Sequence, residues 1–240
     1  MVNVAIDRIA KQQLNIILLI DASKSMEGRR IKQVNDAIKE IKDYLVDLQG
    51  ENTNVDFYMT IIPFSTEASF YKSNKMINIS SFNFKGIKTG GWSNLHCGYD
   101  YLAKILKKES KGGIMPDFGG IAPIILLLTD GHPTTNKYKE SLKKLKELPW
   151  FNVSMRYGVA IELDDSRTMQ VLHEFVEGSG DVIRCFSADV LKQIIQIIVI
   201  TASKVKSTTT EVHVKYNTTK HVETKQLIAE ALSQIENWGW

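Results

Sequence analysis

The chain has 240 residues, of which 43% are hydrophobic and 24% charged, and its formal net charge is +3. This length and composition fit one large globular domain, or one domain with an extension. The near balance of charge argues against a nucleic-acid-binding protein, which gathers basic residues on one face. No apolar run is long enough to span a membrane as a helix, so we expect no membrane segment.

The N-terminal residues and the cysteines both bear on location. The first residues lack a basic stretch followed by an apolar core, so we expect no secretory signal. Cys97 and Cys185 lie far apart and outside any CxxC pair, which indicates free buried thiols. Together these observations favour a cytoplasmic location.

Strands and helices alternate along the first half of the chain. Residues 14–20 form a continuous apolar run, which is typical of a strand covered on both faces. Apolar residues then recur at helical spacing over 26–48, which predicts an amphipathic helix. Residues 55–65 predict a second strand, and residues 76–80 a short edge strand.

The second half continues the alternation. A glycine-rich turn leads into a helix from about Asn94, and the glycine-rich segment 111–120 predicts an exposed loop. We expect the remaining strands at 122–130, 152–163 and 181–187, and the remaining helices at 135–148, 166–178 and 188–205.

This order of elements predicts an α/β fold with a doubly wound, mostly parallel sheet and helices on both faces. We divide the chain into an N-terminal lead (1–13), a main domain (14–202) and a C-terminal extension (203–240) made of a strand or hairpin arm and a short helix. The extension ends in Trp238 and Trp240, which we expect to dock onto this domain or onto another protein.

Three segments carry oxygen side chains to the edge of this sheet where the strands end. Asp21, Ser23 and Ser25 alternate in DASKSM, Ser93 follows two glycines in GGWSN, and Asp130 ends a strand in LLLTDG. Right-handed crossovers bring the carboxyl ends of parallel strands to one edge, where ligands bind. Hard cations such as Mg²⁺ prefer oxygen ligands at about 2.0–2.1 Å. Since hydroxyls are neutral, an ion held here would still attract one anionic oxygen from outside.

The pattern D-x-S-x-S after the first strand, a glycine-rich Ser/Thr loop and a later T-D-G resembles the von Willebrand factor type A domain and its metal-ion-dependent adhesion site. The resemblance covers roughly residues 14–202. Within that family, the TDGHPT segment and the compact layout look most like intracellular bacterial proteins of tellurium-resistance and stress clusters.

The resemblance implies a set of ligands and a partner. Asp21, Ser23 and Ser25 would hold Mg²⁺ directly or through water, with Mn²⁺ or Ca²⁺ as alternatives. Ser93 would take a position usually held by threonine, and Asp130 would bind the ion, often through water. A glutamate or aspartate of a partner protein would complete the shell.

The chain departs from the family pattern at two points. Lys24 stands where D-x-S-G-S has glycine, so it either points to solvent or assists an acidic ligand and weakens the metal. Ser93 lacks the threonine methyl group, and Thr89 is the alternative if the loop is placed differently.

We expect a partner-binding rim of Lys24, Trp92 and His132 around this site. Trp92 is either an exposed anchor for a partner or packed under its loop. His96 and His132 lack a third nitrogen or sulfur ligand at suitable spacing, which argues against zinc. Asp164 and Asp165 follow another strand, and we expect Asp165 to cap the next helix.

Three functions are compatible with these residues. The first is a non-enzymatic scaffold that recruits an acidic loop of another protein through Mg²⁺. The second is a Mg²⁺-dependent hydrolase of phosphate esters, which would need a positioned base and usually a second ion or charged clamp. The third is a structural subunit that binds no metal. The oxygen-rich pattern without a clear base favours the first.

Overall fold

The computed structural model describes residues 11–51, 55–71, 76–163, 165–207 and 230. These residues form a six-stranded sheet in the order β3-β2-β1-β4-β5-β6. All neighbouring strands pair in parallel except β3, which is antiparallel to β2. The strands are β1 (Gln12–Asp21), β2 (Val55–Phe64), β3 (Ile77–Asn78), β4 (Ile124–Thr129), β5 (Met155–Ile161) and β6 (Val182–Cys185). The predicted mostly parallel α/β sheet is confirmed.

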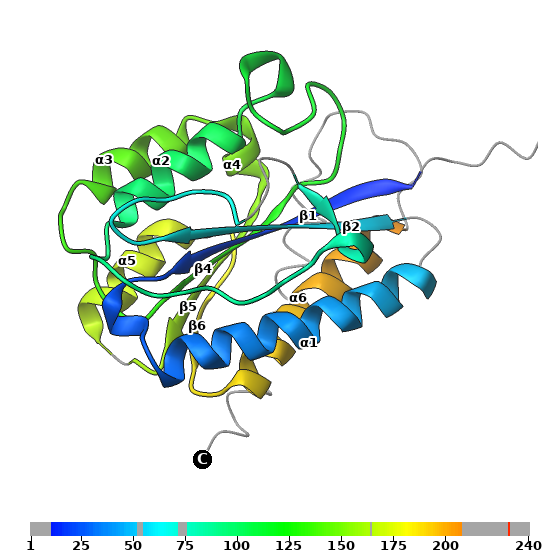
Figure 1. Ribbon diagram of the computed structural model, residues 1–240. Coiled ribbons are helices and arrows are strands. Elements are labelled where there is room, and N and C mark those ends of the chain that lie inside the picture. Colours follow the sequence, from blue (N-terminus) through cyan, green and yellow to red (C-terminus); the bar gives the residue numbers. More distant parts are fainter. Residues whose placement is uncertain (1–10, 52–54, 72–75, 164, 208–229, 231–240) are drawn as a thin grey trace, which may run out of the picture.

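Helices cover both faces of the sheet, and Figure 1 shows the two layers on either side of it. One layer consists of α1 (Arg29–Glu51) and α6 (Ala188–Ser207). The other consists of α2 (Leu95–Ile105), α3 (Tyr138–Lys146), α4 (Pro149–Val153) and α5 (Ser166–Val176). Short 3-10 turns occupy Lys24–Met26 (η1), Ile79–Ser81 (η2) and Glu109–Lys111 (η3).

The central strand β1 shows why both layers are needed. Its side chains alternate between the two cores: Leu18 and Ile20 pack with α1 and α6, whereas Ile17 and Leu19 pack with α2, α3 and α5. All four are fully buried. Because burying one such side chain stabilises the fold by roughly 1.5–3 kcal/mol, an apolar run of this kind holds helices on both faces.

The strand order changes direction beside β1. The chain lays down β2 and β3 on one side of β1, then crosses over to build β4, β5 and β6 on the other. The direction of winding therefore changes between β1 and β4, and ligands in such folds bind outside the carboxyl ends of the strands at that point. Ile20 pairs with Leu128, so Asp21 ends its strand beside Thr129 and Asp130.

Two helices begin later than their sequence patterns predict. The helix expected over 135–148 begins at Tyr138, because the N–H of Thr134 donates to the carbonyl of Ser93 (2.9 Å) and holds the preceding residues against the site loop. The chain then turns at Leu148 and starts α4 with Pro149. The first helix begins at Arg29, after the turn η1.

Regular structure extends past the expected limits of the main domain. Strand β1 begins at Gln12, and α6 continues to Ser207. The expected C-terminal arm, with Trp238 and Trp240, lies outside the described residues, as does most of the expected N-terminal lead. In the part of the chain that the structure describes, no helix has both the length and the apolar character needed to cross a bilayer.

Both cysteines are free, as the sequence predicts. Cys185 is buried and donates to the carbonyl of Ser187 (3.2 Å). Cys97 is only half-buried, so the expected burial is wrong for this thiol, and its sulfur contacts the Nε2 of His96 (3.4 Å).

Candidate functional site

Five side chains from three distant segments meet at the carboxyl ends of β1 and β4, and we call them the oxygen cluster: Asp21, Ser23, Ser25, Ser93 and Asp130. The hydroxyl of Ser93 donates to Oδ2 of Asp21 (2.8 Å), and the N–H of Ser23 donates to Oδ1 (2.9 Å). The hydroxyls of Ser23 and Ser25 are 3.1 Å apart. Ser25 in turn donates to Oδ1 of Asp130 (2.8 Å). The structure thus brings together all five residues that the sequence selects.

Backbone hydrogen bonds hold the two serine loops against each other. The N–H of Lys24 donates to the carbonyl of Gly91 (3.1 Å), and the N–H of Gly90 donates to that of Ala22 (2.8 Å). Gly91 has a φ of +77°, and a Cβ at this position would clash with the hydroxyl of Thr66. The glycine turn is therefore required to bring Ser93, rather than the alternative Thr89, to Asp21.

Asp21 is a fully buried carboxyl group. Burial raises its pKa above the ordinary value of 3.8, and hydrogen bonds from Ser23, Thr129 and Ser93 oppose that rise. Thr129, which the sequence analysis did not select, donates to Oδ2 of Asp21 (2.8 Å). Its position in the T-D-G motif at a strand end was the available signal. A cation at this site would favour the ionised form of Asp21.

Asp130 is held by an arginine that the sequence analysis missed. Its side chain is fully buried, and Nη1 of Arg30 donates to its Oδ2 (2.6 Å). The same Nη1 donates to the carbonyl of Ser25 (3.2 Å), so Arg30 contacts the oxygen cluster at two points. The doubled arginine at the start of the first predicted helix was the only signal in the sequence.

Glu162 supplies a third carboxylate near this edge. It follows the end of β5 and has a φ of +50°, a value that residues other than glycine rarely adopt. It forms an ion pair with Nε of Arg29 (2.8 Å) and accepts a hydrogen bond from Nε2 of Gln33 (2.8 Å), and Nε of Arg30 lies 3.7 Å away. The sequence signal was the same as for the two aspartates: a carboxylate directly after a buried strand.

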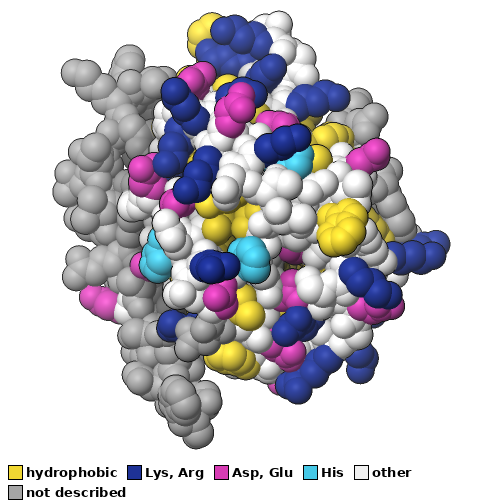
Figure 2. Space-filling model, turned by 90° about the vertical axis from the view of Figure 1, so that its left-hand side faces the viewer, with side chains coloured by type: hydrophobic (Ala, Val, Ile, Leu, Met, Phe, Trp, Pro, Cys, Tyr) yellow, Lys and Arg dark blue, Asp and Glu magenta, His cyan; other side chains and the backbone are white. Residues whose placement is uncertain are grey.

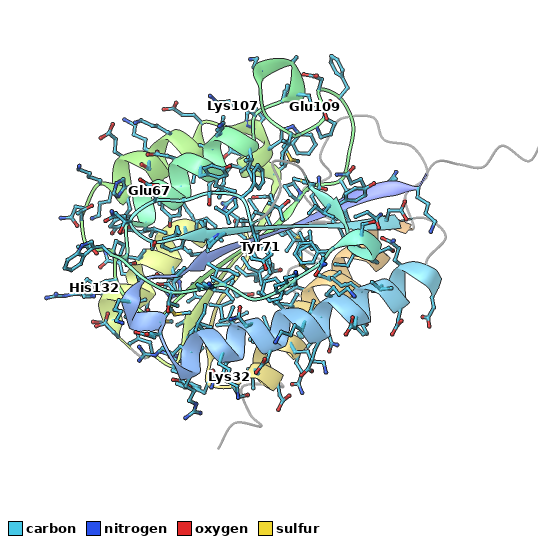
Figure 3. The ribbon with its side chains drawn as sticks, viewed as in Figure 1. Lys32, Glu67, Tyr71, Lys107, Glu109 and His132 are labelled. Carbon is cyan, nitrogen blue, oxygen red and sulfur yellow. The ribbon has the colours of Figure 1, made fainter. Side chains whose placement is uncertain are left out.

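The expected rim residues are exposed at this edge, onto which Figure 2 looks. Lys24 points to solvent and forms an ion pair with Glu27. Trp92 is 68% exposed, which rejects packing under its loop. Figure 3 shows His132 at the same end of the sheet, away from the loop that carries Lys107 and Glu109.

The loop that follows β5 carries Asp165, which caps the next helix. Asp165 accepts a hydrogen bond from the N–H of Thr168 (2.9 Å) and caps α5, as expected. This bond is the main reason that the pKa of Asp165 lies below its ordinary value. Asp164 lies outside the described residues.

The chemistry of the oxygen cluster fits a hard divalent cation. Among the described residues no three His, Cys, Asp or Glu side chains are grouped as metal ligands, so an ion at this edge would depend on hydroxyl groups. Two carboxylates and three hydroxyls are all-oxygen donors of the kind that Mg²⁺ takes. Arg30 is the cation that already contacts this set.

Comparison with known families agrees with this fold. A model of the von Willebrand factor type A domain matches residues 15–197. The chain belongs to the von Willebrand factor type A (VWA) family. VWA domains are modules known for protein–protein interaction, and the doubly wound α/β sheet is their fold.

Relatives of the VWA domain come from proteins longer than this chain. Bovine inter-alpha-trypsin inhibitor heavy chain H4 is 32% identical over 129 residues, which are 51% of this chain and 13% of that protein. Its human counterpart is 30% identical over 179 residues, 67% of this chain and 18% of that protein. A solved von Willebrand factor type A structure from Catenulispora acidiphila has a TM-score of 0.57 at 12% identity, covering 80% of this chain and 43% of the other. These matches identify the family and the fold, while the metal, the adhesion-site role and the closeness to tellurium-resistance proteins stay predictions.

Proposed function

We propose that this VWA domain is a metal-dependent protein-binding module. The oxygen cluster would hold Mg²⁺ at the carboxyl ends of β1 and β4, and the ion would engage a glutamate or aspartate of a partner protein. The observation that carries the proposal is that two carboxylates and three hydroxyls converge into one hydrogen-bonded cluster. Ser25 and Asp130, which are hydrogen-bonded to each other, lie 105 positions apart in the sequence.

The charge of the donor set supports binding of an external acid. Three of the five donors are neutral hydroxyls, so the ion would keep more positive charge than in an all-carboxylate site. A carboxylate from outside can neutralise that charge. The surrounding surface offers the exposed Trp92, and aromatic residues are frequent anchors in protein interfaces.

A calorimetric titration with Mg²⁺, repeated with Mn²⁺ and Ca²⁺, tests the metal site. We expect the wild-type chain to release or absorb heat on binding, and Asp21→Asn to lose at least tenfold in affinity, because a neutral amide of the same shape cannot balance the ion. Asp100→Asn, which removes an exposed carboxylate on α2, is the matched control and should bind as the wild type does. Equal behaviour of the wild type and Asp21→Asn rejects the metal site.

The partner's acid is tested with a pair of short peptides, one bearing a single glutamate and the other a glutamine at the same position. We expect the glutamate peptide alone to bind, and only when Mg²⁺ is present. Binding that persists in a chelator would show that the metal does not mediate recognition.

One observation favours a second candidate, a VWA domain that binds no ion. Arg30 lies 2.6 Å from Asp130 and supplies a positive charge without any metal. This candidate would be supported if the wild-type chain gave no heat of binding in the titrations with any of the three cations. Nothing in the described residues favours the phosphate-ester hydrolase.

The proposal extends to a setting, a bacterial stress or tellurium-resistance system in the cytoplasm. Its support is the sequence resemblance of the TDGHPT segment and the compact layout. The wild type and Asp21→Asn also test this setting. A bacterial strain that lacks the gene should regain tellurite tolerance when it expresses the wild type, and not when it expresses Asp21→Asn. Equal tolerance in the deleted and parent strains would reject the setting.

A further inference from the structure

Helix α1 begins with two arginines, at the end of the helix where positive charge is unfavourable. Arg29 and Arg30 open the helix, and no acidic residue accompanies them in that turn. The amino end of a helix bears a partial positive charge, so cations are unfavourable there. Lys32, on the same helix, points away from the sheet (Figure 3). The two arginines instead contact the carboxylates of Asp130 and Glu162, which directly follow β4 and β5.

Arg30 lies between two carboxylates. Its Nη1 is 2.6 Å from Oδ2 of Asp130, and its Nε is 3.7 Å from Oε2 of Glu162. The Asp130 side chain is fully buried, whereas those of Glu162 and Arg30 are 20% and 31% exposed. The guanidinium therefore has a short contact with the oxygen cluster and a second acceptor beside it, nearer to solvent.

Both oxygens of Asp130 are occupied by groups of this chain. Oδ1 accepts from the hydroxyl of Ser25 (2.8 Å), and Oδ2 accepts from Arg30. A divalent ion that draws on Asp130 would meet a guanidinium already bound to the same carboxylate. Two cations at such short range repel strongly, and the burial of Asp130 limits screening by salt.

We propose that Arg30 sets the metal affinity of this VWA domain by competing with the ion for Asp130, and that Glu162 receives the guanidinium when the ion binds. This inference rests on the proposed metal-dependent function. The backbone of Glu162 supports its part: a glutamate held at a φ of +50° is an unfavourable conformation that persists where surrounding contacts maintain it, often at a functional site. Its contacts with Arg29 and Gln33 keep its carboxylate beside Arg30.

The test is a Mg²⁺ titration of Arg30→Gln beside Lys32→Gln. Both variants remove one positive charge near the start of α1, but Arg30 contacts Asp130, whereas Lys32 is exposed and points away from the sheet. We expect Arg30→Gln to bind Mg²⁺ roughly tenfold more tightly than the wild type, and Lys32→Gln to stay within about threefold of it. Arg30→Lys, which keeps the charge without the planar fork, should lie between the wild type and Arg30→Gln. If Arg30→Gln does not fold, the Mg²⁺ affinity of Arg30→Lys can be compared with that of the wild type instead.

Glu162 is tested by a double-mutant cycle. Glu162→Gln should weaken Mg²⁺ binding severalfold in the wild-type background, because Arg30 then has only Asp130 as its acid. In the Arg30→Gln background the same change should have a clearly smaller effect. Additive effects would mean that Glu162 acts only through its own charge, and would reject its role as the second acceptor.

The outcomes separate this inference from the function on which it rests. If the wild type binds Mg²⁺ and Arg30→Gln binds equally or more weakly, competition is wrong and Arg30 instead positions Asp130. If Arg30→Gln binds and the wild type does not, competition by Arg30 is supported, whereas the proposed metal-dependent function fails for the wild-type chain. If none of the folded chains binds Mg²⁺, Mn²⁺ or Ca²⁺, the proposed function fails and the inference fails with it.

Discussion

Asp21 is the residue in which the proposed metal-binding role and the stability of the fold conflict. It ends a strand of fully buried apolar side chains, and it is fully buried itself. Three hydroxyl or amide groups donate to it, and burial still raises its pKa. A buried carboxylate that gains nothing from a nearby cation lowers the stability of the folded state. The hydrogen bonds reduce this loss, and a bound divalent ion would reduce it further.

This conflict predicts a pH dependence for the metal-free protein. Because the folded-state pKa of Asp21 is raised above 3.8, the folded state holds the proton more tightly than the unfolded state does. The contribution of Asp21 to stability is therefore greatest below about pH 3.8 and is lost as the pH rises through the raised folded-state value. Asp21→Asn lacks this loss, so in chelator its free energy of unfolding should exceed that of the wild type by a margin that grows with pH.

Urea denaturation at a series of pH values from 4 to 8 measures that margin. Adding Mg²⁺ should shrink it, because the ion stabilises only the chain that keeps the carboxylate. A margin that does not change with pH would show that burial of Asp21 does not limit stability.

At the scale of the elements, one buried arginine joins α4 and α5 to the sheet. Arg156 on β5 is 5% exposed, and its guanidinium donates to the carbonyls of Phe175 and Val176 at the end of α5 (3.0 and 3.1 Å) and to that of Phe151 in α4 (2.5 Å). It also lies over the ring of Phe151. Burial lowers its pKa to about 10, which leaves it charged at neutral pH. Arg156 therefore adds donors to carbonyls at the ends of these helices, beside the donors that Ser154 gives to Phe151 and Ser179 gives to Val176.

We expect Arg156→Lys to destabilise the domain by roughly 2 kcal/mol, because an ammonium group cannot reach all of these carbonyls at once. Urea denaturation measures the change, and Arg167→Lys on the exposed side of α5 is the control that should have almost no effect. If both substitutions have the same small effect, the three carbonyls are satisfied without Arg156.

At the scale of the whole molecule, the sheet needs a helix layer on each face to exclude water from its apolar strands. Helix α6 supplies much of one layer: Leu191, Ile194, Ile195 and Ile198 are fully buried against the strands and α1. Among the described residues, the two cores draw on elements from β1 through α6.

We therefore expect a chain of residues 11–207 to unfold in a single cooperative transition, within a few degrees of the full-length melting temperature. A chain of residues 11–187, which lacks α6, should not fold, because one face of the sheet is left exposed to water. Thermal unfolding followed by circular dichroism distinguishes the two. Failure of the 11–207 chain to fold would assign the rest of the C-terminal extension to the core of the domain.

The sequence by itself determined the fold class and the members of the oxygen cluster. Continuous apolar runs and helical spacing are local patterns, and parallel topology then requires that Asp21 and Asp130 reach one edge. Only the tertiary structure decided what surrounds them. The contacts of Thr129, Arg30 and Glu162 depend on how strands and a helix far apart in the sequence are placed and on where their side chains point. Residue spacing in the sequence does not predict these contacts, because ion pairs between distant elements form only after the sheet and helices have packed.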